Sequence, residues 1–127
     1  MKSREDIESY LLKINMPSEP LGPELWNLKP EGQENLIISI AGPVVVFRIK
    51  VMELPPNNRE QLYHTLLKLN ASDMVHGAFG VEDQAVVINH ALALENLDFN
   101  EFQAVVEDIT FAISKHYPLL SKFRAAA

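Results

Sequence analysis

The stretch Asn35–Met52, NLIISIAGPVVVFRIKVM, contains two strand-like segments joined by Gly42-Pro43, and it decides the fold class. In the second segment, apolar residues alternate with Arg48 and Lys50, a period of two that is typical of a sheet with one buried face. The connection between the two segments is very short, which favours an antiparallel pair of strands. We therefore expect this stretch to form the core of an antiparallel sheet.

Helix and strand patterns continue on both sides of this pair. Apolar residues at spacings of three and four predict helices over residues 3–16, 59–69 and 98–117, the last of them ended by Pro118. A weaker strand is expected over residues 24–28, and a hairpin over residues 75–94 with its turn at 82–84. The stretch from Pro17 to Pro23 is predicted to be a stiff, extended connector, because its three prolines cannot lie within a helix interior.

Several residues predict where the helices begin and end. Ser3 with Asp6, and Asp98 with Glu101, have the three-residue spacing of capping boxes at helix N-termini. Asn70 is expected to close the middle helix in the left-handed conformation.

The predicted order of elements is α-β-β-β-α-β-β-α. This order predicts an α+β fold with a mostly antiparallel five-stranded sheet and with helices mainly on one face. A length of 127 residues fits one hydrophobic core. We expect residues 1–122 to form a single domain and residues 123–127 a disordered tail.

Composition and charge exclude several classes of protein. Hydrophobic residues make up 47% of the chain and charged residues 22%, as in folded globular proteins. There is no cysteine, which excludes disulfides and cysteine-based metal centres. The formal net charge is −6 without any basic cluster, which argues against a nucleic-acid partner. The charged N-terminus and the short apolar runs predict a cytoplasmic protein that does not insert into membranes.

No arrangement of side chains in the sequence indicates catalysis or a cofactor. The four histidines, His64, His76, His90 and His116, lack the spacing of metal ligands, although His76 and His90 lie on opposite arms of the predicted hairpin. The carboxylates fall mainly in helix caps and turns, where solvation and capping explain them. Phosphate-binding loops and nucleophile elbows are absent from the sequence. We therefore predict a protein that is not an enzyme and has no metal and no cofactor.

The apolar content of the predicted sheet leaves two interpretations open. Residues such as Ile37 and Val46 look exposed, which is more apolar surface than a monomer of this size is expected to leave in water. One interpretation is a homodimer seam together with a docking surface for an extended peptide. The other is an ordinary core whose strand register differs from the one predicted.

Five passages make the sequence similar to the type III secretion (Tir) chaperone-like superfamily, over roughly Ile7–Leu120. They are Leu62-x-x-x-Leu66-Leu67-x-Leu69-Asn70, Phe79-Gly80-Val81-x-Asp83, Val86-Val87-Ile88 through Leu94, Leu97-Asp98-x-x-Glu101-Phe102 and His116-Tyr117-Pro118-Leu119-Leu120. The last of these passages resembles the YbjN-like branch of the superfamily.

The resemblance implies a small acidic homodimer that holds an extended segment of a partner protein. The residues that it implies for the dimer interface are Leu62, Leu66, Leu69, Val87, Ala91 and Ala93. The residues that it implies for binding of the partner peptide are Tyr10, Leu11, Ile14, Leu36, Ile38 and Phe47. Two other functions stay open at this point, a regulatory adaptor in a bacterial sensory pathway and a small-molecule-binding domain.

Overall fold

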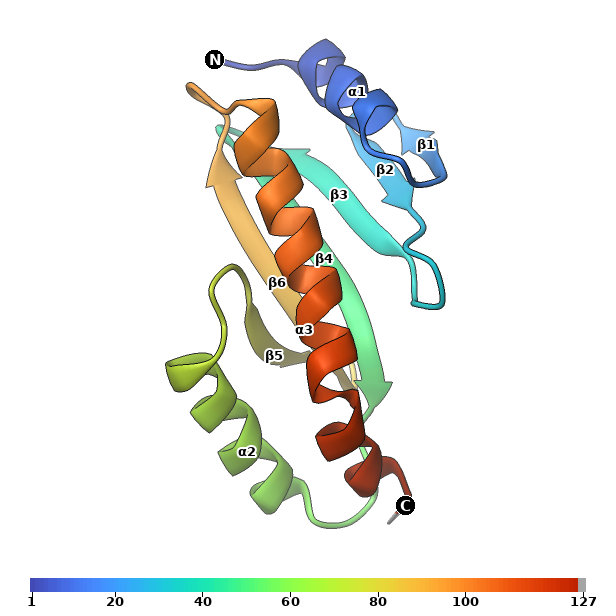
Figure 1. The fold of residues 1–127 in the computed structure, drawn as a ribbon, viewed down its shortest axis with the longest axis vertical. Helices are drawn as coiled ribbons and strands as arrows, with labels where there is room; N and C mark the ends of the chain where they lie inside the picture. The colour runs from blue at the N-terminus through green and yellow to red at the C-terminus, as the bar shows by residue number, and fades with distance from the viewer. Residues whose placement is uncertain (126–127) are drawn as a thin grey trace.

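Six strands form one antiparallel sheet in the computed structural model, which describes residues 1–125. The strand order across the sheet is β1-β2-β3-β4-β6-β5, so β4 and β6 are central neighbours while β1 and β5 form the two edges (Figure 1). The strands are β1 (Ser18–Gly22), β2 (Leu25–Leu28), β3 (Leu36–Ala41), β4 (Val44–Glu53), β5 (Ala78–Glu82) and β6 (Ala85–Ala93).

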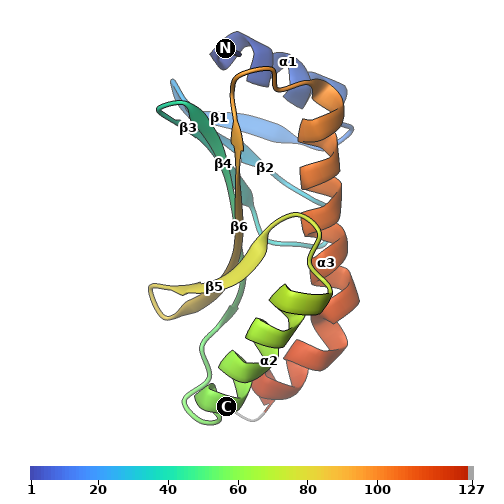
Figure 2. The same cartoon turned by 90° about the vertical axis from the view of Figure 1, so that its left-hand side faces the viewer.

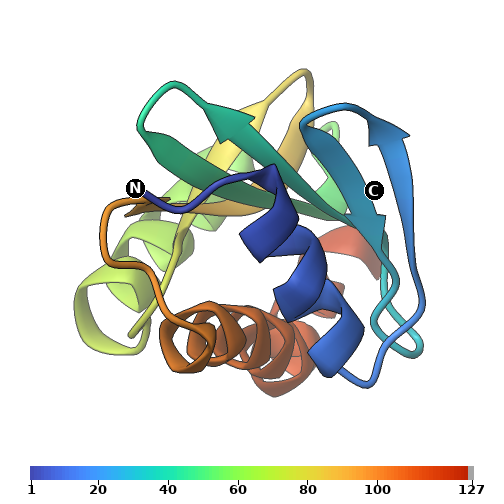
Figure 3. The ribbon, with the colours of Figure 1, turned by 90° about the horizontal axis from the view of Figure 1, so that it is seen from above.

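Three helices, α1 (Arg4–Lys13), α2 (Arg59–Ser72) and α3 (Phe99–Ala125), lie on the same face of this sheet. Figure 2 shows the sheet on one side and the helices on the other, and Figure 3 shows α1 and α3 beneath the sheet. No helix among residues 1–125 covers the opposite face. The predicted α+β class, with its helices on one face, is confirmed.

The predicted count of five strands is wrong, because the proline-rich connector forms the additional strand β1. Residues 18–22 pair with β2 in antiparallel register, with Pro20 opposite Trp26. Proline cannot donate a backbone hydrogen bond, but an edge strand needs donors on one side only. The position of β1 at the edge of the sheet therefore tolerates the prolines that argued against a strand.

The core is built around β4, which pairs with β3 on one side and β6 on the other. Phe47 is fully buried, and the centroid of its ring lies 5.4 Å from that of Phe102 on α3. Tyr10 stacks on the same Phe102 ring at 5.5 Å, and its hydroxyl donates a 2.7 Å hydrogen bond to the carbonyl of Leu97. These contacts attach α1 and α3 to the middle of the sheet.

The predicted left-handed end of α2 at Asn70 is wrong, since the helix continues to Ser72. The side chain of Asn70 instead bonds to the backbone of Phe79 in β5. Its Oδ1 accepts from the Phe79 N–H at 2.7 Å and its Nδ2 donates to the Phe79 carbonyl at 3.1 Å. A primary amide carries both a donor and an acceptor, so one side chain can hold α2 against the edge strand.

Helix α3 begins as predicted but extends past its predicted end. Oδ1 of Asp98 accepts from the N–H of Glu101 at 2.8 Å, as expected for a capping residue. The helix then passes through Pro118 to Ala125, so the tail predicted from residue 123 is wrong for residues 123–125. Leu120 is buried and Phe123 packs against the core, and this burial offsets the hydrogen bond that proline removes. Residues 126 and 127 lie outside the described part of the chain.

Candidate protein-binding surfaces

The residues implied for partner binding lie inside the subunit. All six have side chains that are at most 7% exposed and belong to the hydrophobic core: Tyr10, Leu11, Ile14, Leu36, Ile38 and Phe47. Their burial agrees with the second interpretation of the sequence, in which these apolar residues form an ordinary core.

The residues implied for the dimer interface separate into two groups. Leu62, Leu66 and Leu69 on α2 are buried in the core, at most 9% exposed. Ala91 and Ala93 are exposed on the sheet. On α2 itself, the large apolar residues that reach the surface are Tyr63 and Leu67, 37% and 67% exposed.

The side of the sheet that faces away from the helices presents a half-exposed apolar strip, here called the open face. Strand register places Ser39, Val46 and Ala91 side by side across β3, β4 and β6. The neighbouring row brings Ile37 next to Arg48. Six apolar side chains contribute to the open face: Leu25, Ile37, Val44, Val46, Ala91 and Ala93.

Charged side chains bound the open face at its β5 end. Arg48 forms a 3.0 Å ion pair with Glu82, and Lys50 pairs with Glu53. Together with Ile37 and Val87 they line a depression of about 310 Å³. Val87 is buried beneath these charged side chains, whereas Ala91 is not. The open face therefore combines an apolar centre with a paired-charge border.

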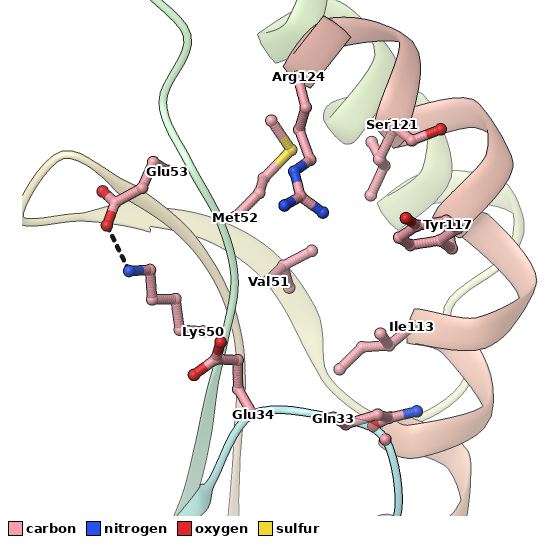
Figure 4. Close-up of a pocket in the computed structure, with 12 residues that line it drawn as sticks. Gln33, Glu34, Lys50, Val51, Met52, Glu53, Ile113, Tyr117, Ser121 and Arg124 are labelled. Carbon is pink, nitrogen blue, oxygen red and sulfur yellow. Dashed lines mark hydrogen bonds and ion pairs between the residues drawn. The ribbon is translucent and has the colours of Figure 1, made fainter.

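A second concave surface, here called the β4 groove, lies between the end of β4 and the C-terminal half of α3 (Figure 4). It forms because β3 begins at Leu36, opposite Ile49, so the last residues of β4 pair with β6 alone. The loop before β3 turns away toward α3, where Gln33 Nε2 donates to the Thr110 carbonyl at 3.0 Å. The resulting cavity has a volume of about 380 Å³.

The β4 groove has an apolar floor and a polar rim. The floor residues Met52 and Leu120 are buried in the core, and Ile113 packs against them. The guanidinium of Arg124 projects into the groove and forms no ion pair with any other residue in 1–125 (Figure 4). The hydrogen bond to Glu53 raises the pKa of Lys50 above its usual value, so the rim keeps a second cation.

Gln33 also lines the groove, but its Oε1 is buried and accepts no hydrogen bond from the described residues. Because this oxygen has no exposed surface, a ligand in the groove does not reach it. The β4 groove thus offers a free strand edge, an apolar floor and the Arg124 guanidinium, which has no ion-pair partner within residues 1–125. No sequence signal indicated it, because the groove depends on where β3 begins relative to β4.

His76 and His90, which the sequence places on opposite arms of the predicted hairpin, lie close together. The ring centroids of His76 and His90 lie 5.5 Å apart in an edge-to-face arrangement. Within residues 1–125, the histidines and carboxylates form no group of three or more that could hold a metal ion. In the same part of the chain, no helix is long and apolar enough to cross a membrane.

Comparisons with known proteins match the whole chain to one family and to several solved structures. The family model CesT_Tir_1 matches residues 1–126. Curated protein sequences contain no match. The fold is similar to a chain of the heterodimeric ExoU–SpcU complex from the type III secretion system of Pseudomonas aeruginosa. This similarity has 15% sequence identity and a TM-score of 0.71, and it covers 89% of this chain and 96% of that one.

Two further structures share the fold. YbjN from E. coli, a proposed transcription regulator, has 16% identity and a TM-score of 0.69, with 93% of each chain covered. A chain of the HopA1–SchA chaperone–effector complex has 10% identity and a TM-score of 0.62, with 87% of each chain covered. The similarity therefore extends over nearly the whole fold at low sequence identity, and the predicted resemblance to secretion chaperones and YbjN is confirmed.

Proposed function

Because this chain belongs to the CesT_Tir_1 family, we propose that it is a cytoplasmic, non-catalytic protein-binding module that holds an extended segment of a partner protein. The similar HopA1–SchA structure is a chaperone–effector complex, which supports a chaperone-like role. The single observation that carries the proposal is the β4 groove, where an unpaired strand edge lies beside an apolar cavity. We place the partner segment there.

The free edge of β4 explains why the segment would be extended. Met52 and Glu53 pair with β6 on one side, with a register irregularity at Val51, and among the described residues no strand pairs with residues 51–53 on the other side. An extended peptide can supply the missing backbone hydrogen bonds by adding a strand. Successive side chains of such a strand point to opposite faces, so one apolar side chain would rest on Met52 and Leu120.

The rim of the groove indicates the chemistry of the segment. Arg124 has no carboxylate partner within residues 1–125, and a guanidinium binds carboxylates with paired, directional hydrogen bonds. We therefore expect an apolar side chain in the groove and an acidic side chain close to it.

Photocrosslinking at position 117 tests this placement, because Tyr117 lines the groove and is 57% exposed. Replacing Tyr117 with p-benzoylphenylalanine in the purified protein, followed by crosslinking in an extract of the source cells, would identify the segment by mass spectrometry. A synthetic peptide with the crosslinked sequence then provides the affinity measurement.

Tyr117→Glu is expected to weaken binding of that peptide about tenfold or more, since it replaces an aromatic contact with a charge next to the apolar floor. Leu119→Glu is the matched control, because Leu119 is also a partly exposed apolar residue of α3 but does not line the groove. Equal weakening by both variants, or crosslinks only to the surface of a folded domain, would contradict the proposal.

The open face is proposed as the contact between two copies of the chain. Its apolar centre, which includes the predicted interface residues Ala91 and Ala93, is covered by no helix formed by residues 1–125 of its own subunit. Sheets that pack face to face bury such side chains between them. Leu62, Leu66 and Leu69, which were predicted to lie in the dimer interface, would not touch the second copy in this arrangement. They would affect the dimer only indirectly, because they pack in the core of the subunit.

A regulatory adaptor is the second candidate function, favoured by the similarity to YbjN. In that case the partner would be a folded signalling protein. The net charge of −6 argues against nucleic acid as the partner. The crosslinking experiment separates the two candidates, because an adaptor would crosslink to a folded domain and a chaperone to an extended segment.

A further inference from the structure

The segment that joins α2 to β5, residues 73–77, is here called the connector; it contains His76, and His90 and His116 contact it. The connector approaches α3 and lines a cavity of about 210 Å³ together with Asp108, Phe111 and Lys115. Its two ends are held by different polar contacts, and each of these contacts includes a histidine.

The middle of the connector is attached to α3 through His76. Nδ1 of His76 lies 2.5 Å from Oδ2 of Asp108, and both side chains are partly exposed. This contact persists when His76 gains a proton, because the imidazolium and the carboxylate then carry opposite charges.

The end of the connector is attached to β6 through His90. The backbone N–H of Gly77 donates a 3.0 Å hydrogen bond to Nδ1 of His90. Gly77 has a φ of +86°, and a Cβ at this position would lie 3.0 Å from Ile88 Cγ2. The backbone is therefore tightly fitted against β6, and the connector has little room to shift while this hydrogen bond is kept.

The start of the connector lies near two basic groups of α3. Oδ2 of Asp73 is 3.5 Å from the Lys115 ammonium and 3.8 Å from Nε2 of His116. His116 is only 6% exposed and packs its ring against Phe79 of β5.

We propose that these contacts form a pH-sensitive clasp, in which protonation of His90 releases Gly77 and frees the end of the connector together with the start of the edge strand β5. The rest of the sheet stays paired. This inference is independent of the partner segment and of the dimer proposed above.

The chemistry of imidazole explains why His90 is the release point. Neutral imidazole offers one acceptor nitrogen, which His90 uses for the Gly77 N–H, whereas imidazolium is a donor at both nitrogens. After protonation, two N–H groups would point at one another across 3.0 Å, and the hydrogen bond is lost. A protonated His76, 5.5 Å away between ring centroids, adds repulsion.

The half-buried His90 and the buried His116 respond to acid in the same direction. Burial, with a smaller contribution from the charge of His76, lowers the pKa of His90 below its usual value. Burial also lowers the pKa of His116, where Lys115 acts in the same sense and Asp73 opposes it. A histidine with a lowered pKa in the closed state stabilises that state fully above a pH of about 6.5 and loses this contribution as the pH falls.

Opening is expected to be local because of the position of β5. It is an edge strand that pairs with β6 alone, and the side chain of Asn70 holds its Phe79 backbone from outside the sheet. Segments with few partners open at a lower free energy than the whole molecule.

Amide hydrogen exchange on the ¹⁵N-labelled protein between pH 5.5 and 7.5 tests the clasp. After correction for the intrinsic exchange rate, protection of the Gly77 amide should fall at low pH. The fall is at most about tenfold for each pH unit that separates the open and closed pKa values of His90. Amides of the β3–β4 pairing serve as the reference and should keep their protection.

His90→Asn is the decisive variant, since asparagine Oδ1 stands as many bonds from Cβ as histidine Nδ1 does and does not titrate. Its Gly77 protection should be independent of pH. The clasp is wrong if this variant retains the pH dependence of the wild type, if Gly77 protection in the wild type does not change, or if the reference amides lose protection equally.

A measurement on the wild type alone covers the case in which His90→Asn does not fold. The amide chemical shift of Gly77 should change with the same midpoint as the ring resonances of His90. A Gly77 shift that follows no histidine titration would overturn the proposal.

Discussion

Individual side chains on α2 differ sharply in what they do, although they are neighbours in the sequence. Leu66 is 4% exposed and belongs to the core, whereas Leu67 is 67% exposed. Both are leucines within the same apolar arc, so the pattern alone did not separate core from surface. The sheet beneath α2 decides which of the two side chains loses its contact with water.

Leu66→Ala is expected to lower the free energy of unfolding by about 2–5 kcal/mol, because it leaves a cavity in the core. Leu67→Ala, the matched control, should change it by less than about 0.5 kcal/mol, as for other exposed positions. Urea denaturation followed by circular dichroism provides the measurement. Similar losses for both variants would mean that α2 is packed differently from the arrangement described.

Where a strand or helix forms and ends depends on the elements that pack beside it as well as on its own residues. Strand β1 exists despite Pro20 because it lies at an edge, and α3 continues through Pro118 because the turns beyond it bury Leu120. The beginning of α3 follows the local rule instead. Asp98 accepts the hydrogen bond of the Glu101 N–H, which satisfies one of the free donors of the first turn.

Asp98→Ala is expected to destabilise the protein by about 1 kcal/mol, since it removes this cap. Asp98→Asn keeps an oxygen at the same position and should cost only a few tenths of a kcal/mol. Thermal unfolding of the two variants at one pH gives the comparison. If they lose the same stability, the cap contributes nothing through its hydrogen bond.

At the scale of the whole molecule, the helices cover one face of the sheet and leave the other to solvent. A standard interface buries about 800 Å² on each partner. We propose that two copies make such a contact through the open face, which the charged residues Arg48 and Lys50 border.

The wild type is expected to sediment as a dimer at tens of micromolar. Ala91→Arg should weaken association at least about a hundredfold, because it places an unpaired charge in the apolar centre of the contact. Since Ala91 is exposed within the subunit, the fold should be retained. Leu12→Arg, at an exposed position of α1, should leave the dimer intact. A monomeric wild type would remove the proposed contact.

The candidate site could be predicted only in part. The sequence placed His76 and His90 on opposite arms of one predicted hairpin, a relation that is local in sequence, although in the structure His76 precedes β5. Asp108, which bonds to His76, comes from a helix 32 residues away, and no pattern links the two. The β4 groove had no sequence signal for the same reason. It exists because β3 begins opposite Ile49, which leaves the last residues of β4 without a partner on that side.

The sequence by itself determined the elements whose signals are local: the strand pair of β3 and β4 with the alternation in β4, the hairpin of β5 and β6, the apolar stripes of the helices and the cap at Asp98. Only the tertiary structure decided that residues 18–22 pair as an edge strand, that Leu66 is core while Leu67 is not, and which face of the sheet stays open. The physical reason is that periodicity shows which side chains avoid water, whereas the partner that covers each of them is set by packing between segments far apart in the chain.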